Sequence, residues 1–520
     1  MGMPDSAAEN TRAVTADSVP SEGPVDTRSD YGGDEPWAEE QIQGIDSRDR
    51  KKSLSDILTI VCAGFALISD GYQNNLMTMI NVLLTQEYPD DYDSTMKTRV
   101  SNALLVGEVI GMIVIGLTCD LMGRKWAITT TTALIVIGGI LATASHGSTT
   151  TGMFWMMVVS RGIIGFGNGG EYPASSTSAS EAANEATRRR GGVFVMVTNL
   201  PLSFGGPFAI IVFIIVYCAA GKDHLSTIWR VCFGIGCVWP LSVFYFRWKM
   251  ANSKLYKKGA IKHNVPYWLA LKYYWPRLIG TCGAWFFYDF VTFPNGIFSG
   301  SIIASLVDDS SNLLTTAEWQ LLLGVIALPG VFLGALVCDR LGRKYTMMIG
   351  FSGYLVFGLI IGCSYNKISK ILPLFVVFYG LMNSSGNFGP GNMLGLSSSE
   401  AYATGVRGTF YGLSAAVGKA GAAIGTQVFT PIQNNLGKQW TFIIAAIIGV
   451  CGIVITYFFI PHLREDDLKT QDIEFYQYLR AHGWTGPIGE DANSIIDSSD
   501  PPASKQTVTT EEREVLESRN

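Results

Sequence analysis

The chain has 520 residues, of which 48% are hydrophobic and only 16% charged, and its formal net charge is −5. Because a soluble globular chain carries about 25% charged residues, this composition argues against a soluble protein and predicts an all-α membrane protein with many spans. The charges gather in the tails and loops, so no nucleic-acid partner is expected. Nine cysteines occur without any C-x-x-C spacing, which indicates neither a disulfide framework nor a metal site.

The chain has polar ends and an apolar middle. Residues 1–50 are polar and acidic without an apolar run, which is typical of a disordered tail and not of a cleavable signal peptide. A second polar tail covers 461–520. About 20 apolar residues cross a bilayer, so the middle predicts twelve transmembrane helices, near 57–83, 101–119, 126–146, 152–176, 192–218, 228–248, 278–305, 318–337, 345–364, 371–397, 408–431 and 439–460.

Basic residues predict how these spans are oriented. From Arg247 to Arg277 inclusive there are eight Lys or Arg residues and no Asp or Glu, and two basic pairs, at 124–125 and 343–344, fall in short loops on the same side. Because positive charge marks the cytoplasmic face, both tails and a basic central loop at 249–277 are expected there. This loop separates an N-terminal six-helix half, 51–248, from a C-terminal half, 278–460.

The two halves repeat one another. G-L-T-C-D-L-M-G-R-K at 116–125 recurs as A-L-V-C-D-R-L-G-R-K at 335–344, and 219 residues separate Asp120 from Asp339 (339 − 120). In transporters built from repeats, the substrate site lies between them near the middle of the membrane. Asp120 is expected to cap a helix N-terminus and to pair with Arg124 in a charge latch, and the repeat gives Asp339 and Arg343 the same role.

Ionisable residues inside apolar spans are the candidate functional residues, because a charge at membrane depth is costly and usually marks an ion or substrate path. Asp70 lies in the first span, Glu171 in the fourth, Asp289 in the seventh and Lys419 in the eleventh. Lys419 can neutralise a phosphate as a point charge, and Asp289 is expected to pair with it when the site is empty. Glu108, in the second span, is assigned no role.

Several motifs resemble known transporters. D-L-M-G-R-K and D-R-L-G-R-K are similar to the loop signature of the major facilitator superfamily. G-F-G-N-G-G-E-Y-P at 165–173 and G-L-S-A-A-V-G-K at 412–419 resemble the phosphate:proton symporter branch of that superfamily. The longer strings V-M-V-T-N-L-P-L-S-F-G-G-P-F-A at 195–209 and Y-D-F-V-T-F-P-N-G-I-F-S at 288–299 resemble the fungal glycerophosphoinositol permeases.

The resemblance implies a major facilitator fold and proton-coupled uptake of glycerophosphodiesters, chiefly glycerophosphoinositol, across the plasma membrane. The protein would use protons as the coupling ion, need no cofactor and act as a monomer. The implied substrate-binding residues are Tyr172, Asn199, Trp285, Asp289, Asn392 and Lys419. The implied proton-coupling residues are Asp70, Arg161 and Glu171, and the gating residues are Asp120, Arg124, Asp339 and Arg343.

The chain departs from the phosphate carriers at four positions, one of which is Asn199 in the fifth span, where that branch has a glutamine. Glu171 stands where that branch usually has Asp, Phe293 replaces a tyrosine and Gly391 replaces an asparagine. Fewer donors and more room would favour a phosphodiester over inorganic phosphate. Glycerophosphocholine or inorganic phosphate as the main substrate, and a nutrient sensor that binds without transport, remain alternatives.

Overall fold

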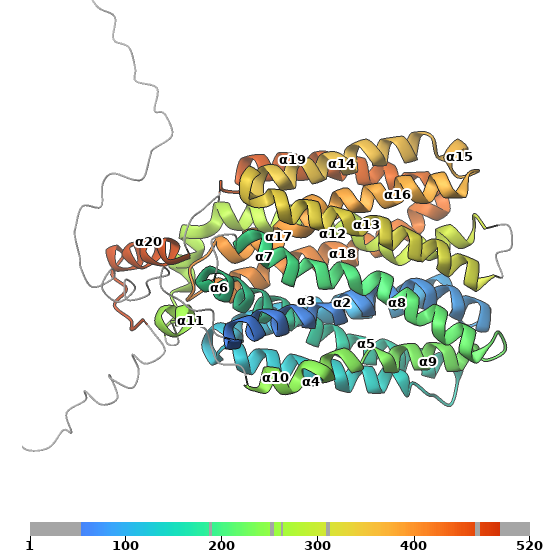
Figure 1. Ribbon diagram of the computed structural model, residues 1–520, viewed down its shortest axis with the longest axis horizontal. Helices are drawn as coiled ribbons and strands as arrows, with labels where there is room; N and C mark the ends of the chain where they lie inside the picture. The colour runs from blue at the N-terminus through green and yellow to red at the C-terminus, as the bar shows by residue number, and fades with distance from the viewer. Residues whose placement is uncertain are drawn as a thin grey trace, which may run out of the picture.

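The computed structural model describes residues 54–186, 190–249, 254–261, 264–307, 312–462 and 468–488. These residues form helices joined by short loops, without a strand among them. Most helices run along the long axis of the molecule, with those of the first half on one side and those of the second half on the other (Figure 1). The tail predicted at 1–50 and the last part of the tail predicted at 461–520 lie outside the described residues.

The first half contains ten elements, of which η1 is a π-helical turn. They are α2 (Leu54–Glu87), α3 (Ser94–Met122), α4 (Arg124–Thr143), α5 (Thr150–Glu171), η1 (Tyr172–Ser176), α6 (Thr177–Ala186), α7 (Arg190–Val197), α8 (Asn199–Ala220), α9 (Leu225–Ile235) and α10 (Val238–Lys249).

The second half follows a short helix, α11 (Lys254–Gly259), and contains a second π-helical turn, η2. Its elements are α12 (Tyr267–Ala304), α13 (Leu313–Leu341), α14 (Arg343–Cys363), α15 (Tyr365–Ile368), α16 (Leu372–Gly386), η2 (Asn387–Gly391), α17 (Asn392–Glu400), α18 (Arg407–Leu436), α19 (Gln439–Phe459) and α20 (Leu468–Ala481). The central segment 249–277, predicted as a loop, is therefore partly helical, because α11 lies within it and α12 begins at Tyr267.

All twelve spans expected from the sequence fall on helices. Among the described residues, seven segments are long and apolar enough by themselves to cross a membrane. They are Ser94–Met122, Arg124–Thr143, Gly191–Ala220, Leu225–Ser242, Leu313–Leu341, Arg343–Cys363 and Gln439–Phe459. The other five expected spans correspond to α2, α5 with η1, α12, α16 to α17, and α18. These carry Asp70, Glu171, Asp289, Asn392 and Lys419, whereas Asn199 lies in one of the seven apolar segments, Gly191–Ala220.

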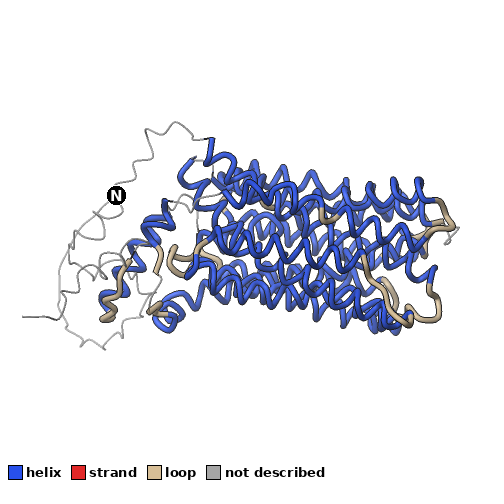
Figure 2. Tube along the Cα trace, turned by 90° about the horizontal axis from the view of Figure 1, so that it is seen from below, coloured by secondary structure: helices blue, strands red, loops and turns tan. Residues whose placement is uncertain are grey.

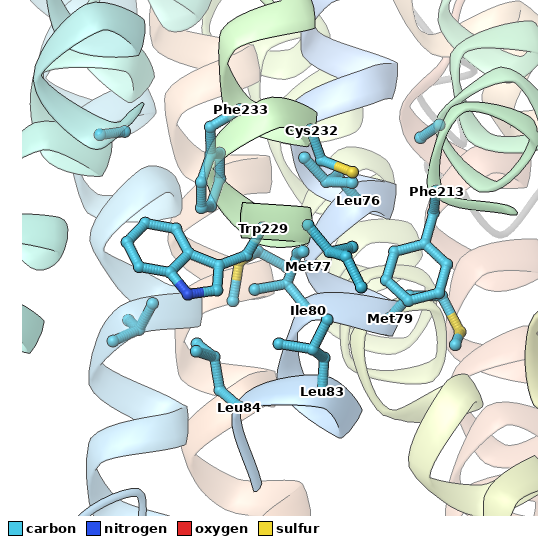
Figure 3. Close-up of a cluster of buried hydrophobic side chains, with 14 of the residues drawn as sticks. Leu76, Met77, Met79, Ile80, Leu83, Leu84, Phe213, Trp229, Cys232 and Phe233 are labelled. Carbon is cyan, nitrogen blue, oxygen red and sulfur yellow. The ribbon is translucent and has the colours of Figure 1, made fainter. Parts of the chain in front are cut away.

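Apolar packing fixes the helices within each half. In one cluster, Leu76 and Ile80 of α2 lie beside Phe213 of α8 and beside Trp229 and Phe233 of α9, as Figure 3 shows. All five side chains are buried. Burying a side chain of this size contributes about 1.5–3 kcal/mol, so this cluster ties the outer helix α9 to the inner helices α2 and α8.

Helix α20 docks against one end of the bundle, at which α11 and the start of α2 also lie; Figure 2 shows that end at the left. We name it the α20 end, and the opposite end the α15 end. Phe475, Tyr476 and Leu479 of α20 belong to a buried cluster with Tyr274 and Phe410. The amphipathic pattern of the helix therefore has a partner within the protein, and α20 becomes part of the folded domain.

A buried carboxylate anchors α20. Asp472 accepts hydrogen bonds from the Thr404 backbone N–H (2.5 Å) and the Thr404 hydroxyl (2.7 Å), and the Arg407 guanidinium lies 3.9 Å away. Burial raises the pKa of Asp472 to about 6, while Arg407 and the two Thr404 hydrogen bonds oppose the shift. Since Thr404 lies in the loop just before α18, Asp472 links α20 to the start of that helix.

We expect Asp472→Ala to release α20 from the bundle. Both Thr404 donors would stay buried without an acceptor, which costs about 1–3 kcal/mol, so trypsin should cleave after Arg480 roughly ten times faster. Glu474→Ala is the matched control, because that carboxylate is exposed on the same helix. Equal cleavage rates for the two variants would contradict the anchoring role of Asp472.

Candidate functional site

A cavity of about 230 Å³ lies between the two halves. The six substrate-binding residues inferred from the sequence all line it: Tyr172, Asn199, Trp285, Asp289, Asn392 and Lys419. Asp70 lines it too, whereas Arg161 and Glu171 are not among its lining residues. Because the wall takes Tyr172 and Asn199 from the first half and the others from the second, the cavity depends on how the two halves meet.

Glycines bring Lys419 to the cavity. On α18, a Cβ at Gly418 would lie 2.3 Å from the Trp285 indole, and a Cβ at Gly421 would lie 2.7 Å from the Phe286 carbonyl oxygen. Small residues are needed wherever two membrane helices approach so closely. The absence of side chains at these positions lets α18 pack directly on α12, and this packing holds Lys419 beside the residues of α12.

Lys419 is buried and shares its charge with two carboxylates of the first half. Its Nζ lies 3.0 Å from Glu108 Oε2 and 4.0 Å from Asp70 Oδ2. The ammonium also lies 3.6 Å from the centre of the Phe293 ring, where ring and cation attract one another. The contact with Glu108 occupies one of the three N–H donors of the ammonium, and no further hydrogen bond of Nζ to the described residues is present, so the other donors can reach a ligand.

The pairing of Lys419 with Asp289 expected from the sequence is replaced by the pair with Glu108. Asp289 is buried on the cavity wall, and its Oδ2 has no hydrogen-bond partner among the described residues. The structure thus adds Glu108 to the site, although the sequence assigned it no role. The signal that could have found it was present, since it is the one carboxylate in the interior of the second span.

Asp70 sits at the centre of a hydrogen-bond network. It accepts hydrogen bonds from the Tyr172 hydroxyl (2.6 Å), the Asn74 amide (2.7 Å) and the Asn168 amide (3.2 Å). The Asn74 amide also donates to Glu108 Oε1 at 3.1 Å. Three donors therefore compensate the charge of Asp70, whereas Glu108 depends on Lys419 and one shared amide.

Glu171 and Arg161 lie apart from this network. Glu171 pairs with Arg247 at 2.6 Å and accepts a hydrogen bond from the Thr132 hydroxyl at 3.3 Å. Arg161 donates from Nε to the Val100 carbonyl oxygen at 2.9 Å. Arg247, which by sequence belongs with the basic residues of the central loop, is buried in α10, where its charge compensates that of Glu171 inside the first half.

At the α20 end, a charge latch joins the two halves. Asp120 of α3 caps the start of α18, accepting hydrogen bonds from the backbone N–H groups of Gly408 (3.0 Å) and Thr409 (2.6 Å). Arg124 pairs with Asp120 at 2.6 Å and with Glu181 at 3.2 Å. Glu181 in turn pairs with Arg407 of the second half at 3.2 Å. The sequence predicts that Asp120 caps a helix but does not indicate which one. In the structure this helix is α18.

The repeat produces a second latch. Asp339 of α13 accepts a hydrogen bond from the Gly192 N–H of α7 at 3.1 Å and pairs with Arg343 at 3.1 Å. Arg343 also pairs with Glu400 at 2.9 Å. Each half thus presents an aspartate to the start of a helix in the other half, and both contacts favour a conformation in which the α20 end is held together.

Hydrogen bonds inside the cavity also cross between the halves. The Asn199 amide donates to Asn392 Oδ1 at 2.6 Å. Gly391 does not provide the extra space expected from the sequence, since a Cβ there would lie 2.9 Å from the Tyr288 hydroxyl and 3.4 Å from Asn387 Oδ1. The place of the missing side chain is taken by these two polar groups of the protein.

Comparison with known proteins supports the same architecture. The model of the sugar (and other) transporter family matches residues 57–475. The chain is 61% identical to glycerophosphoinositol permease 1 of Candida albicans over 452 residues, which cover 85% of this chain and 87% of that protein. It is 57% identical to glycerophosphoinositol transporter 1 of Saccharomyces cerevisiae over 466 residues, 89% of each chain.

A solved structure shows the fold. The major facilitator superfamily proton:xylose symporter XylE from E. coli superposes with a TM-score of 0.70 at 15% identity, covering 82% of this chain and 100% of that one. The twelve-span, two-half arrangement of the present chain agrees with this likeness. The chain therefore belongs to the sugar (and other) transporter family, in the same group of membrane transporters as the two fungal proteins, and it has the major facilitator fold.

Proposed function

We propose that the protein takes up glycerophosphodiesters, chiefly glycerophosphoinositol, across the plasma membrane. The observation that carries the proposal is Lys419, which is the only Lys, Arg or His among the described residues that line the cavity. A phosphodiester is a monoanion and matches one cation, whereas inorganic phosphate near neutral pH is partly a dianion. The names of the two similar fungal proteins support the same substrate.

Substrate binding and proton binding would be coupled through Lys419. When a phosphodiester takes the ammonium, Glu108 loses its cation while it stays buried. A buried carboxylate without a partner favours its protonated form, so Glu108 would accept a proton as the substrate binds. Asp70 would keep its three donors and hold Asn74 and Tyr172 in place.

The two latches would control access to the cavity. The basic residues predict that the α20 end faces the cytoplasm. In the present conformation both latches hold this end together, so the substrate would enter from the α15 end. Release would require the Asp120 and Asp339 caps to open, and rocking of one half against the other is the usual route in transporters built from repeats. We infer that a monomer suffices, since the cavity lies within one chain.

Replacing Lys419 by Ala should abolish uptake while the protein still reaches the membrane. A hydrogen bond to a charged group is worth about 1.5–3 kcal/mol, so uptake of labelled glycerophosphoinositol should fall by roughly 10- to 100-fold. Lys367→Ala is the control, because this lysine is exposed in α15. A Lys419→Ala protein that retains more than about half of the wild-type rate would remove the basis of the proposal.

Uptake should rise as the external pH falls from about 7 to about 5 and should collapse with a protonophore, because protons would be taken up with the substrate. Glu108→Gln keeps the shape of the side chain but cannot carry the proton. We expect this variant to exchange external for internal substrate while it no longer accumulates substrate against a gradient.

The matched variant for this experiment is Glu171→Gln, which removes the carboxylate that pairs with Arg247. The family resemblance implies proton coupling at Glu171, so comparing the two variants shows which of the two carboxylates couples transport to protons. If Glu171→Gln loses accumulation and Glu108→Gln keeps it, coupling runs through the Glu171–Arg247 pair and not through Lys419.

A further inference from the structure

Helix α12 presents two neighbouring strips of side chains to the cavity. Trp285, Asp289 and Phe293 follow one another at intervals of four residues and form the first strip. Tyr288 and Thr292 precede Asp289 and Phe293 by one residue each, which places them about 100° further round the helix. All five residues line the cavity, so a ligand in the cavity can contact both strips at once.

The first strip faces α18 and its cation. Gly418 packs on the Trp285 indole, and Lys419 Nζ lies over the Phe293 ring. This strip, together with Lys419, would therefore contact the phosphate, which is the charged part of a phosphodiester. It offers few hydrogen-bonding groups to an arm of the diester that is uncharged and carries hydroxyls.

The second strip faces a group of hydroxyls and one amide. Thr292 and Tyr354 of α14 are joined by a hydrogen bond of 2.9 Å, and the rings of Tyr288 and Tyr354 are 6.1 Å apart. The Tyr288 hydroxyl and Asn387 Oδ1 both border the space at Gly391, since a Cβ there would lie 2.9 Å from the first and 3.4 Å from the second. Asn387 donates from Nδ2 to the Ala327 carbonyl oxygen at 3.0 Å, which orients its amide.

We propose that Tyr288, Thr292, Tyr354 and Asn387 form a second subsite, which binds the uncharged polyhydroxylated arm of the phosphodiester whose phosphate Lys419 holds. The proposal rests on the proposed function. Each of the four residues lines the cavity, and none carries a charge. Hydroxyls and amides both donate and accept hydrogen bonds, which is the chemistry needed to recognise a ring of hydroxyl groups.

The subsite gives the cavity a preference between two kinds of arm. A quaternary ammonium arm has neither donors nor acceptors, so it gains nothing from these hydroxyls and leaves them unpaired once water is expelled. Sites built to hydrogen-bond a substrate hydroxyl reject analogues that lack it, because their buried polar groups then stay unsatisfied. The cavity, at about 230 Å³, is many times larger than the roughly 10–15 Å³ that accommodates one water on the same measure, so it has room beyond the phosphate.

The test compares competitors in cells that express only this carrier. Labelled glycerophosphoinositol is supplied at trace concentration, and the concentration of unlabelled glycerophosphoinositol, glycerophosphocholine or inorganic phosphate that halves its uptake is measured. Two near-isosteric variants, Thr292→Val and Tyr354→Phe, remove the hydroxyls of the subsite. Tyr365→Phe is the control, because Tyr365 lies on α15 outside the cavity lining.

The double variant should need roughly ten times more glycerophosphoinositol to halve uptake, since two neutral hydrogen bonds are lost. The values for glycerophosphocholine and inorganic phosphate should stay within about twofold of wild type, which also shows that the phosphate subsite and the fold are intact. If the concentration that halves uptake rises equally for all three competitors, or does not rise for glycerophosphoinositol, the second subsite is refuted while the proposed function stands. If cells that express only the wild-type carrier take up no glycerophosphodiester, the proposed function is refuted, and the second subsite with it.

Discussion

Lys419 is a cation buried between the two halves, and its charge constrains the structure around it. An isolated ammonium in an apolar interior is prohibitively costly, and an ion pair repays that cost only when geometry and hydrogen bonds are favourable. Here the compensation comes from the other half, through Glu108 at 3.0 Å and Asp70 at 4.0 Å. The halves must therefore approach closely at this depth whenever the site is empty. A bound anion can replace the carboxylates as the partner of Lys419, which makes the contact between the halves dependent on the substrate.

Close approach of the helices is what allows so short an ion pair. On α3, Glu108 follows Gly107, at which a Cβ would lie 2.2 Å from the Gly162 carbonyl oxygen of α5. On α18, glycines at 418 and 421 remove the side chains that would hold α12 away. The chain has 57 glycines, and those at these crossings let the helices approach closely. This close packing brings the long, polar side chains of Lys419 and Glu108 together, whereas bulkier helix surfaces would keep the two side chains apart.

The sequence predicted the spans, the repeat and the cavity-lining residues, because apolar length, motif spacing and buried charge are local features. It did not predict the partners of those residues. Glu108 and Arg247 became part of ion pairs only through packing between helices that are far apart in the chain, as with Arg247 and Glu171, 76 residues apart. The extra space expected at Gly391 is absent for the same reason, since the Tyr288 hydroxyl comes from α12, whose approach to η2 no motif encodes. The position of α20, anchored by Asp472 at Thr404, depends likewise on a contact 68 residues away in sequence.

The latch and the cavity cation lie on the same pair of helices. On α3, Asp120 and Glu108 are separated by twelve residues (120 − 108), and on α18, Gly408 and Lys419 by eleven (419 − 408), so each pair spans roughly 16–18 Å. The two helices run in opposite directions, which brings Asp120 to the start of α18 and Glu108 to Lys419. Between these contacts the helices touch at glycine, where a Cβ on Gly412 would lie 3.0 Å from Gly116 Cα. A substrate that separates Lys419 from Glu108 would remove one contact along this seam, while the Asp120 cap and the hydrogen bond from the Asn102 amide of α3 to the Ala423 carbonyl oxygen of α18 (3.2 Å) would remain.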